Sequence, residues 1–387
     1  MDLSNFKQRV ESIFGIGREY RVFRAPGRVN IIGEHTDYND GFVLPAAIDR
    51  QLFIAAVPVE GRVMTMHSLD KNKESVFSLD SLGKCPLNFW SNYIRGVAKA
   101  IEDSGYVLHG AEFVFGSDIP IGSGLSSSAA LCVASGLAFS ELNGLNLGMD
   151  DIAKFAQRSE NDFVGTNCGI MDQFISAMGK VNNALLIDCR NLSYELMPFN
   201  GEVSIVIADT MIRRGLVDSE YNTRRASCEL AVDILKTVLP DIKALRDISC
   251  RELEDNKDLL NEEVYHRARH VVTENERVLL ATNSMKKGDF ESLGLLLNGS
   301  HISLRDDYEV SCKGLDMMVE IAAKQNGVYG SRMTGAGFGG CTVSLVEPKY
   351  VDEFIKNVGV EYFNKIGKKP NIFSTNACDG AVELRAE

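Results

Sequence analysis

Two glycines followed by three consecutive serines form a candidate phosphate site. Residues 119–131 read Ile-Pro-Ile-Gly-Ser-Gly-Leu-Ser-Ser-Ser-Ala-Ala-Leu, and the apolar run that continues from them predicts a helix. Glycine permits a tight turn and close approach of a ligand, and free N–H groups at a helix N-terminus bind phosphate oxygens. A serine hydroxyl can also reach a phosphate-bound Mg²⁺. The alternative is a Gly-rich turn with one capping serine, which accounts for only one of the three.

This segment is not a Walker A loop, because no lysine follows its glycines. The pattern GxGxxG occurs at residues 335–340, but a β-type run follows it where a dinucleotide-binding motif requires a helix. We therefore reject dinucleotide binding there. Two interpretations stay open for residues 335–340: a hairpin turn, or a glycine-rich loop that lies against the ligand of the first loop.

The polar loop at residues 28–40 is a second candidate site. It gathers a guanidinium, an imidazole and several carboxyl and amide groups: Arg28, Glu34, His35, Asp37, Asn39 and Asp40. Carboxylates accept two hydroxyl protons at once, and unpaired buried polar groups penalise the wrong epimer, so this set is typical of a site that binds sugar hydroxyls. A solvated loop with a local Arg–carboxylate pair is the alternative. The chain contains neither HExxH nor GxSxG, which leaves a metalloprotease or serine hydrolase unsupported.

Two carboxylates in residues 160–173 are candidates for acid–base or metal chemistry. Asp172 lies between Met171 and the apolar residues after Gln173, where a carboxylate must be paired or shifted in pKa. It could be a general base, a partner of Arg28, or simply a helix N-cap. Glu160 ends a predicted helix, where the helix dipole disfavours a negative charge. It could bind a metal or lie on the surface.

The elements around these motifs indicate an α+β chain. Strands are predicted at residues 20–25, 52–57, 63–66, 111–115, 184–188, 203–209 and 342–346. Pro26 and Gly27 should end the first strand, and residues 58–61 should join the next two as a hairpin. Helices are predicted at residues 125–142, 219–238, 264–280, 289–297, 315–323 and 351–366, and another after an Asp150 N-cap.

Length and composition narrow the class of protein. A chain of 387 residues predicts two domains, and we place their boundary between residues 180 and 200, which gives domains 1–190 and 191–387. A net charge of −12 argues against a nucleic-acid partner. Residues 119–140 carry no charge, but their Gly, Pro and Ser predict a loop entering a buried helix, not a membrane span. Nine cysteines without a CxxC pair indicate free thiols in a reducing cytosol.

Taken together and in this order, the motifs resemble the galactokinases of the GHMP small-molecule kinase superfamily. The matching stretches are residues 27–41 (Gly-Arg-Val-Asn-Ile-Ile-Gly-Glu-His-Thr-Asp-Tyr-Asn-Asp-Gly), the Gly/Ser loop, residues 167–173 (Asn-Cys-Gly-Ile-Met-Asp-Gln), 219–225, 300–310 and 332–340 (Arg-Met-Thr-Gly-Ala-Gly-Phe-Gly-Gly). The Gly/Ser and Gly-rich loops are shared by the whole superfamily, whereas residues 33–38 are specific to galactokinases. The resemblance implies an α+β fold whose N-terminal domain is like domain 2 of ribosomal protein S5 and whose C-terminal domain is ferredoxin-like.

The resemblance also implies a reaction and a role for each site residue. The ATP γ-phosphoryl would pass to the C1 hydroxyl of α-D-galactose, the first step of galactose catabolism by the Leloir pathway. Asp172 would take the C1 proton, and Arg28 would hold Asp172 ionised and stabilise the transferring group. The sugar would be bound by Glu34, His35, Thr36, Asp37, Gly169 and Tyr221. The nucleotide would be bound by Ser68, Gly122, Ser123, Gly124, Leu125, Ser126, Ser127 and Ser128, and Mg²⁺ by Ser128 and Glu160.

Three rival functions share parts of this pattern. An N-acetylgalactosamine or arabinose kinase would use the same machinery, and a catalytically inactive galactose sensor would lack residues of the Gly/Ser loop, which is unbroken here. A non-enzymatic nucleotide-binding module would have no need of Asp172. We expect a cytoplasmic monomer that uses galactose, ATP and Mg²⁺ and has no nucleic-acid or membrane partner.

Overall fold

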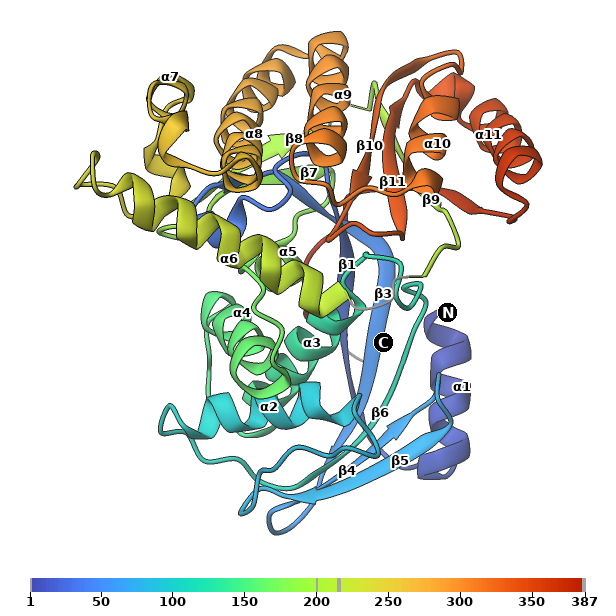
Figure 1. Ribbon diagram of the computed structural model, residues 1–387. Helices are drawn as coiled ribbons and strands as arrows, with labels where there is room; N and C mark the ends of the chain where they lie inside the picture. The colour runs from blue at the N-terminus through green and yellow to red at the C-terminus, as the bar shows by residue number, and fades with distance from the viewer. Residues whose placement is uncertain (1, 200, 214–216, 385–387) are drawn as a thin grey trace.

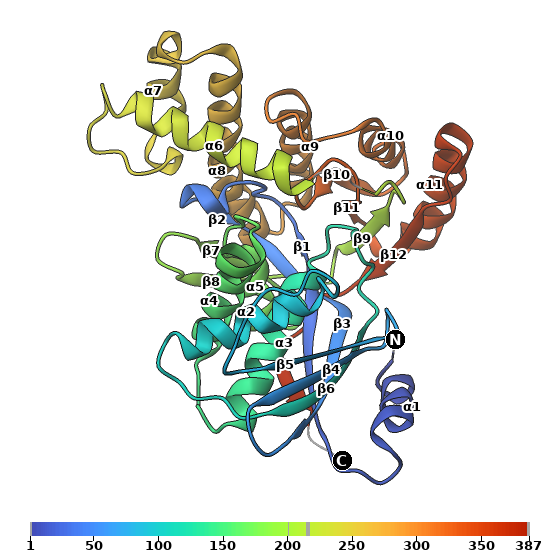
Figure 2. The same cartoon turned by 60° about the horizontal axis from the view of Figure 1, so that its bottom comes forward.

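A computed structural model describes residues 2–199, 201–213 and 217–384. The molecule has two halves that each contain a sheet, and they lie one above the other in Figure 1; Figure 2 shows the same arrangement turned. The first half is a six-stranded sheet in the order β13-β1-β3-β6-β4-β5. Its strands are β1 (Arg21–Asn30), β3 (Pro45–Pro58), β4 (Val63–Ser68), β5 (Lys73–Ser78), β6 (Ala111–Ser117) and β13 (Val382–Leu384). The α+β class predicted from the sequence is confirmed.

Strand β1 is longer than predicted, because it runs through Pro26 and Gly27 instead of ending there. The pairing of β1 with β3 shifts register between Pro26 and Arg28, so the proline lies at an irregularity where its missing N–H is tolerated. Gly27 allows another segment to lie directly on the strand, since a Cβ there would be 2.7 Å from the carbonyl oxygen of Leu125. Arg28 is therefore a strand residue and not a loop residue.

The predicted hairpin between β3 and β4 is wrong. Strand β6 lies between them, pairing antiparallel with β3 and parallel with β4, and the partner of β4 on its other side is β5. Alternation predicted these strands correctly, but it carries no information about which strand lies beside which. Ser68, at the end of β4, is thereby placed opposite Phe115 of β6.

Helices cover the two faces of this sheet unequally. Helices α2 (Ser91–Glu102), α3 (Ser127–Leu142), α4 (Met149–Arg158) and α5 (Met171–Met178) lie on one side, and α1 (Leu3–Phe14) lies on the other (Figure 2). Side chains of β1 alternate accordingly: Val22 packs with α1, and Phe23 with the central core. Helix α3 starts two residues later than predicted, and α4 is preceded by Gly148, so Asp150 is not its cap.

The second half holds a long helical arm and a smaller sheet. The arm contains α6 (Val217–Leu235), α7 (Cys250–Asp255), α8 (Glu262–Lys287) and α9 (Phe290–Asp306). The sheet has the order β10-β11-β9-β12, with β9 (Ser204–Asp209), β10 (Val328–Thr334), β11 (Cys341–Val346) and β12 (Asn371–Thr375), and it packs against α10 (Lys313–Ala322) and α11 (Val351–Ile366). A third sheet joins β2 (Phe42–Val43), β7 (Asn183–Asp188) and β8 (Tyr194–Pro198).

The two halves share one core. A single buried cluster includes Phe23 of β1, Val278 of α8 and Val343 of β11. The chain also returns to its first half at the end, where β13 pairs with β1. A domain boundary near residue 190 stays a prediction. Strand β13 comes after that boundary in the sequence but belongs to the sheet of the first half. Among the described residues, no helix combines the length and apolarity needed to cross a membrane. Helix α3, the source of the uncharged stretch, is buried in the core.

Candidate active site

The Gly/Ser loop lies directly on the end of strand β1. The backbone N–H of Arg28 donates to the carbonyl of Leu125 at 3.1 Å, and the Arg28 Nη1 donates to the carbonyl of Gly124 at 2.5 Å. Arg28 is only 4% exposed. A buried guanidinium must be paired, and its position at the mouth of the loop places a permanent positive charge beside the N-terminus of α3.

Asp172 is the partner of Arg28. Arg28 Nε donates to Asp172 Oδ1 and Nη2 donates to Oδ2, both at 2.7 Å, in a bidentate pair. The Ser126 hydroxyl also donates to Oδ2. Asp172 lies in the first turn of α5, whose N-cap is Ile170, so the N-cap interpretation is wrong and the pairing with Arg28 is confirmed. Burial lowers the pKa of Arg28, but the charges of Asp172 and Glu34 outweigh it and raise that pKa.

This pair faces a cavity of about 220 Å³, which we call the first cavity. Segments far apart in the sequence meet around it: β1 and the loop after it, the Gly/Ser loop, residues 160–172, α6 and the β10–β11 turn. Its predicted site residues are Arg28, Glu34, His35, Asp37, Gly122, Gly124, Leu125, Ser126, Ser127, Ser128, Glu160, Gly169, Asp172 and Tyr221. One crevice therefore collects the three motifs that the sequence singled out.

Asp37 is pressed against Gly169. A Cβ on Gly169 would lie 2.1 Å from Asp37 Oδ2, so only glycine leaves room for this carboxyl group. Burial raises the pKa of Asp37 to about 7, and the nearby charges of Asp172 and Glu34 add to the effect. The backbone N–H of Tyr38 donates to Asp37 Oδ1. Such a group costs stability when it is ionised, which is typical of a carboxylate kept for a ligand.

His35 is held by a chain of hydroxyl groups. Its Nδ1 is 2.7 Å from the Tyr38 hydroxyl, which is 2.7 Å from the hydroxyl of Tyr308. The backbone of His35 has a φ of 65°, an uncommon conformation for a residue with a side chain. Within the described part of the chain Nε2 is buried without a hydrogen-bond partner. Burial lowers the pKa of His35 well below its usual value, so the ring is neutral. The ring of Tyr221 packs against the His35 ring, with 5.5 Å between the two ring centroids.

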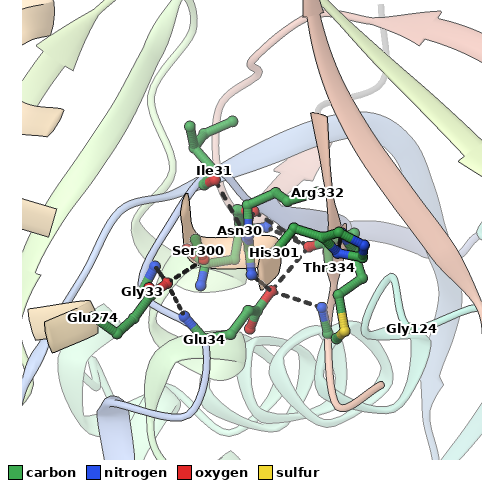
Figure 3. Close-up of polar contacts among 12 residues, drawn as sticks. Asn30, Ile31, Gly33, Glu34, Gly124, Glu274, Ser300, His301, Arg332 and Thr334 are labelled. Carbon is green, nitrogen blue, oxygen red and sulfur yellow. Dashed lines mark hydrogen bonds and ion pairs between the residues drawn. The ribbon is translucent and has the colours of Figure 1, made fainter. Parts of the chain in front are cut away.

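Glu34 is fixed through one of its two oxygens, as Figure 3 shows. The Oε1 atom accepts hydrogen bonds from the Gly335 N–H at 2.7 Å and from the Thr334 hydroxyl at 3.1 Å, and Arg332 Nη2 lies 3.3 Å away. Oε2 accepts no hydrogen bond from a described residue. Glu34 lines the first cavity, so its second oxygen is the one left for a ligand.

Residues from the second half also hold the backbone around Glu34. Glu274 of α8 is fully buried, and its Oε1 accepts from the N–H groups of Gly33 and Glu34 and from the Ser300 hydroxyl (Figure 3). Arg332 Nη1 donates to the carbonyls of Asn30 and Ile31. We call Glu274, Ser300, Arg332 and Thr334 the clamp. Because a buried salt bridge constrains geometry more than it stabilises, the clamp fixes where the loop lies.

Glu160 and Ser128 lie side by side at the other edge of the first cavity. Glu160 is buried in a short π-helical segment (Ser159–Val164), so the surface interpretation is wrong. Burial raises its pKa to about 7, against hydrogen bonds from Gln173 and Ser128 that lower it. The described residues hold no group of three or more His, Cys, Asp or Glu placed to bind a metal. One carboxylate and one hydroxyl do fit Mg²⁺, which commonly takes one or two protein ligands plus substrate phosphates.

A second cavity of about 540 Å³ adjoins the first and shares Gly122, Ser127 and Ser128 with it. Ser68 lines this second cavity and not the first. The other lining side chains are largely apolar or aromatic and include Trp90, Tyr93, Phe115 and Leu131. An apolar slot beside a phosphate-binding helix end fits a planar heterocycle with a phosphate chain.

Two predicted site residues do not line either cavity. Thr36 is buried and its hydroxyl bonds to the carbonyls of Gly33 and Phe42. The Ser123 hydroxyl donates to the carbonyl of Pro120. Both hydroxyl groups therefore stabilise the backbone of their own loops and do not face either cavity. The Gly-rich segment at residues 335–340 is the turn of the β10–β11 hairpin, so the hairpin interpretation is confirmed. Its Gly335 and Ala336 also line the first cavity together with the Gly/Ser loop, and contact with a ligand there stays a prediction.

Sequence reasoning gave no role to the clamp or to the aromatic wall of the second cavity. Ser300, Arg332 and Thr334 lie within residues 300–310 and 332–340, which resemble the galactokinases, and this resemblance is the sequence signal for them. Glu274 lies at an interior position of an ordinary amphipathic helix, and Trp90 precedes another, so their spacing carries no sign of a site.

Comparisons with known proteins agree with this geometry. Three family models match: the galactokinase galactose-binding signature at residues 11–58, the GHMP kinases N terminal domain at residues 92–180 and the GHMP kinases C terminal domain at residues 281–365. A galactokinase from Roseiflexus sp. (strain RS-1) is 46% identical over 380 residues, which cover 98% of this chain and 97% of that one. A galactokinase from Chloroflexus aggregans is 48% identical over 367 residues, 95% of this chain and 94% of the other.

Solved structures are similar along the whole chain. The crystal structure of Lactococcus lactis galactokinase complexed with galactose matches with a TM-score of 0.95 and 39% identity, covering 99% of this chain and 100% of that one. A mevalonate kinase matches with a TM-score of 0.63 and 22% identity, covering 92% of this chain and 99% of that one, which shows a shared fold.

Proposed function

The chain belongs to the galactokinases of the GHMP kinase family, and from that premise we propose how its own residues perform the reaction. The activity is transfer of the ATP γ-phosphoryl group to the C1 hydroxyl of α-D-galactose, giving galactose 1-phosphate and ADP, the first step of the Leloir pathway. Both the family and its two-domain α+β fold are those expected from the sequence.

Galactose occupies the first cavity between Asp37, Glu34 and His35. The observation that supports this is the set of groups left without protein partners: Glu34 Oε2 and His35 Nε2 among the described residues. Neutral His35 can donate from Nε2 when Nδ1 accepts from Tyr38, or accept in the other tautomer. Gly169 forms the floor beside Asp37, and Tyr221 closes the side. Thr36 supports the loop without contacting the sugar.

Asp172 acts as the general base. The C1 oxygen of galactose forms a bond to the γ-phosphorus while the bond from that phosphorus to the bridging oxygen of ADP breaks, and the C1 proton passes to Asp172. Arg28 holds the Asp172 carboxylate in place through its two hydrogen bonds and remains beside the transferring group. A positioned base contributes about 10²–10⁴-fold in rate. Arginine on such a transition state contributes about 10³–10⁵-fold in related enzymes.

ATP lies across the two cavities. The phosphates reach the Gly/Ser loop, where Gly122, Gly124 and residues 126–128 border the first cavity and the N-terminus of α3 offers free N–H groups. The base enters the second cavity between Trp90, Tyr93 and Phe115, with Ser68 at its edge. Ser123 and Leu125 shape the loop: Ser123 bonds to Pro120, and the Leu125 carbonyl accepts from Arg28.

Ser128 and Glu160 would hold Mg²⁺, which when bound supplies positive charge to the phosphate oxygens. The residues of the chain serve this by keeping a hydroxyl and a carboxylate together at the helix end. Gln173 donates to Glu160 Oε1 at 2.9 Å, which orients the carboxylate.

Nine free cysteines fit a reducing compartment, so we place the enzyme in the cytoplasm. We propose a monomer, which size-exclusion chromatography with light scattering tests.

The single observation that carries this proposal is the Arg28–Asp172 pair facing the Gly/Ser loop and Asp37 in one cavity. The test is a coupled ADP-release assay with galactose, glucose, N-acetylgalactosamine and arabinose. We expect the highest kcat/KM with galactose. A preference for N-acetylgalactosamine or arabinose would reassign the substrate. If no sugar stimulates ADP release, the protein is a sensor and not a kinase.

A further inference from the structure

Ser126 adopts a backbone conformation that is unfavourable for serine. Its φ is 63° and its ψ is 43°, in the left-handed region. Glycine occupies that region without steric cost, and the two glycines just before it in the loop, Gly122 and Gly124, both have positive φ. Serine therefore occupies a position that glycine would fill at a lower conformational cost, and we ask which interaction of its side chain offsets that cost.

The Ser126 side chain does not cap the helix. Ser126 is the N-cap residue of α3, and serine at this position commonly accepts a hydrogen bond from a backbone N–H of the first turn. Here the side chain makes no capping hydrogen bond. The hydroxyl donates instead to Oδ2 of Asp172, which lies 46 residues further along the chain.

The bond to Ser126 makes the two oxygens of Asp172 unequal. Oδ2 accepts from Arg28 Nη2 and from the Ser126 hydroxyl, whereas Oδ1 accepts from Arg28 Nε alone among the residues that the structure describes. Arg28 is itself held by the Gly124 carbonyl and cannot shift freely. Oδ1 is thus the oxygen with a lone pair left for a third group.

We propose that Ser126 is a positioning residue for the base: its hydroxyl fixes the rotation of the Asp172 carboxylate and leaves Oδ1 to take the sugar proton. This rests on the proposed galactokinase function. In this role the hydroxyl of Ser126 serves the carboxylate and not the phosphates, while Ser127 and Ser128, which border both cavities, serve the nucleotide.

The test compares Ser126→Gly, Ser126→Ala and the unmodified enzyme. Glycine removes the hydroxyl and the backbone strain, whereas alanine removes the hydroxyl alone. We expect both to lower kcat by about 10- to 100-fold, the effect of one hydrogen bond to a charged group. The KM values for galactose and ATP should stay within about twofold of those of the unmodified enzyme, because neither ligand is bound by this hydroxyl. The Gly variant should unfold at a higher temperature than the Ala variant.

Asn146→Gly is the matched control. Asn146 also has a positive φ, of 52°, but lies on an exposed turn between α3 and α4. Its kcat should be unchanged. A kcat within twofold of wild type in both Ser126 variants overturns the proposal. So does a tenfold rise in the ATP KM with kcat retained, because the hydroxyl would then serve the phosphates. Failure of the galactokinase assignment itself would show differently, as no galactose-dependent ADP release by the unmodified enzyme.

Discussion

The two cavities of the active site are built in opposite ways. The first cavity draws on both halves of the molecule, and its loop is held from behind by Glu274 and Arg332 through buried hydrogen bonds. The second cavity is built by the first half alone, and apolar side chains at its edge are open to solvent, with Leu87 88% exposed and Phe89 52% exposed. We therefore propose that directional bonds select the sugar in the first cavity, whereas shape and apolar contact hold the nucleotide base in the second.

This comparison predicts that substitutions of Asp37 and Asp172 in the first cavity change sugar selection or chemistry, and that substitutions of residues found in the second cavity alone change only nucleotide affinity. Asp172→Asn is the strongest case. We expect kcat to fall by about 10³-fold or more, because the amide cannot take the C1 proton. The galactose Kd, measured by calorimetry, should stay within about tenfold of wild type. Lost sugar binding with retained turnover would contradict the role of Asp172.

Glu274→Gln tests whether the clamp is an electrostatic device. Burial alone would raise the pKa of Glu274, but Arg277, His270 and Arg332 outweigh it and lower the pKa to about 2. Since the folded-state pKa lies below the ordinary value of 4.5, this stabilisation is fully present above pH 4.5 and is lost as the pH falls toward 2. We expect Gln to lower the unfolding free energy by about 3 kcal/mol at pH 7.

Urea denaturation at several pH values measures this effect, and the gap between variant and wild type should narrow below pH 4.5. Glu276→Gln, an exposed position on the same helix, is the control and should change stability by less than about 0.5 kcal/mol. A gap that does not depend on pH would mean that the Glu274 charge has no part in the clamp.

Asp37→Ala sharpens the comparison within the first cavity. Loss of this half-buried acceptor should raise the galactose KM by about 100-fold and leave the ATP KM within about threefold. Asp40→Asn is the matched control, because Asp40 lies in the same loop but pairs with Arg190 and does not line the first cavity. Initial-rate kinetics in both substrates decide the matter, and equal changes in the two KM values would remove Asp37 from the sugar site.

Ser68→Ala should have the smallest effect. The Ser68 hydroxyl lines the second cavity and accepts a long hydrogen bond of 3.4 Å from the N–H of Lys71. We expect the ATP KM to rise by less than about threefold and the galactose KM to remain the same. A tenfold or larger loss of ATP affinity in the same kinetic assay would show that the second cavity also relies on directional bonds, which would break the contrast between the cavities.

Residue type and spacing predicted the site better than they predicted its framework. Asp172 is a candidate because a carboxylate among apolar residues must be paired or shifted in pKa. Arg28 and Asp37 are candidates because they belong to a cluster of charged and polar groups typical of a site for sugar hydroxyls. The position of β6 between β3 and β4 could not be found this way, because strand pairing depends on contacts distant in sequence. The clamp stayed hidden for the same reason: Glu274 and Arg332 acquire their role only when α8 and β10 close over the loop.

The pairing of β13 with β1 has a consequence for how the enzyme is made. Val22 pairs with Leu384, and Arg21 binds Glu383 through two hydrogen bonds of 2.6 Å, so one edge of the first sheet is completed by a segment 362 residues further along the chain. Until that segment has left the ribosome, one edge of β1 presents a row of unpaired backbone groups to solvent. The first sheet is therefore completed only after the second half has been synthesised, and the strand that this late pairing covers is the one that carries Arg28.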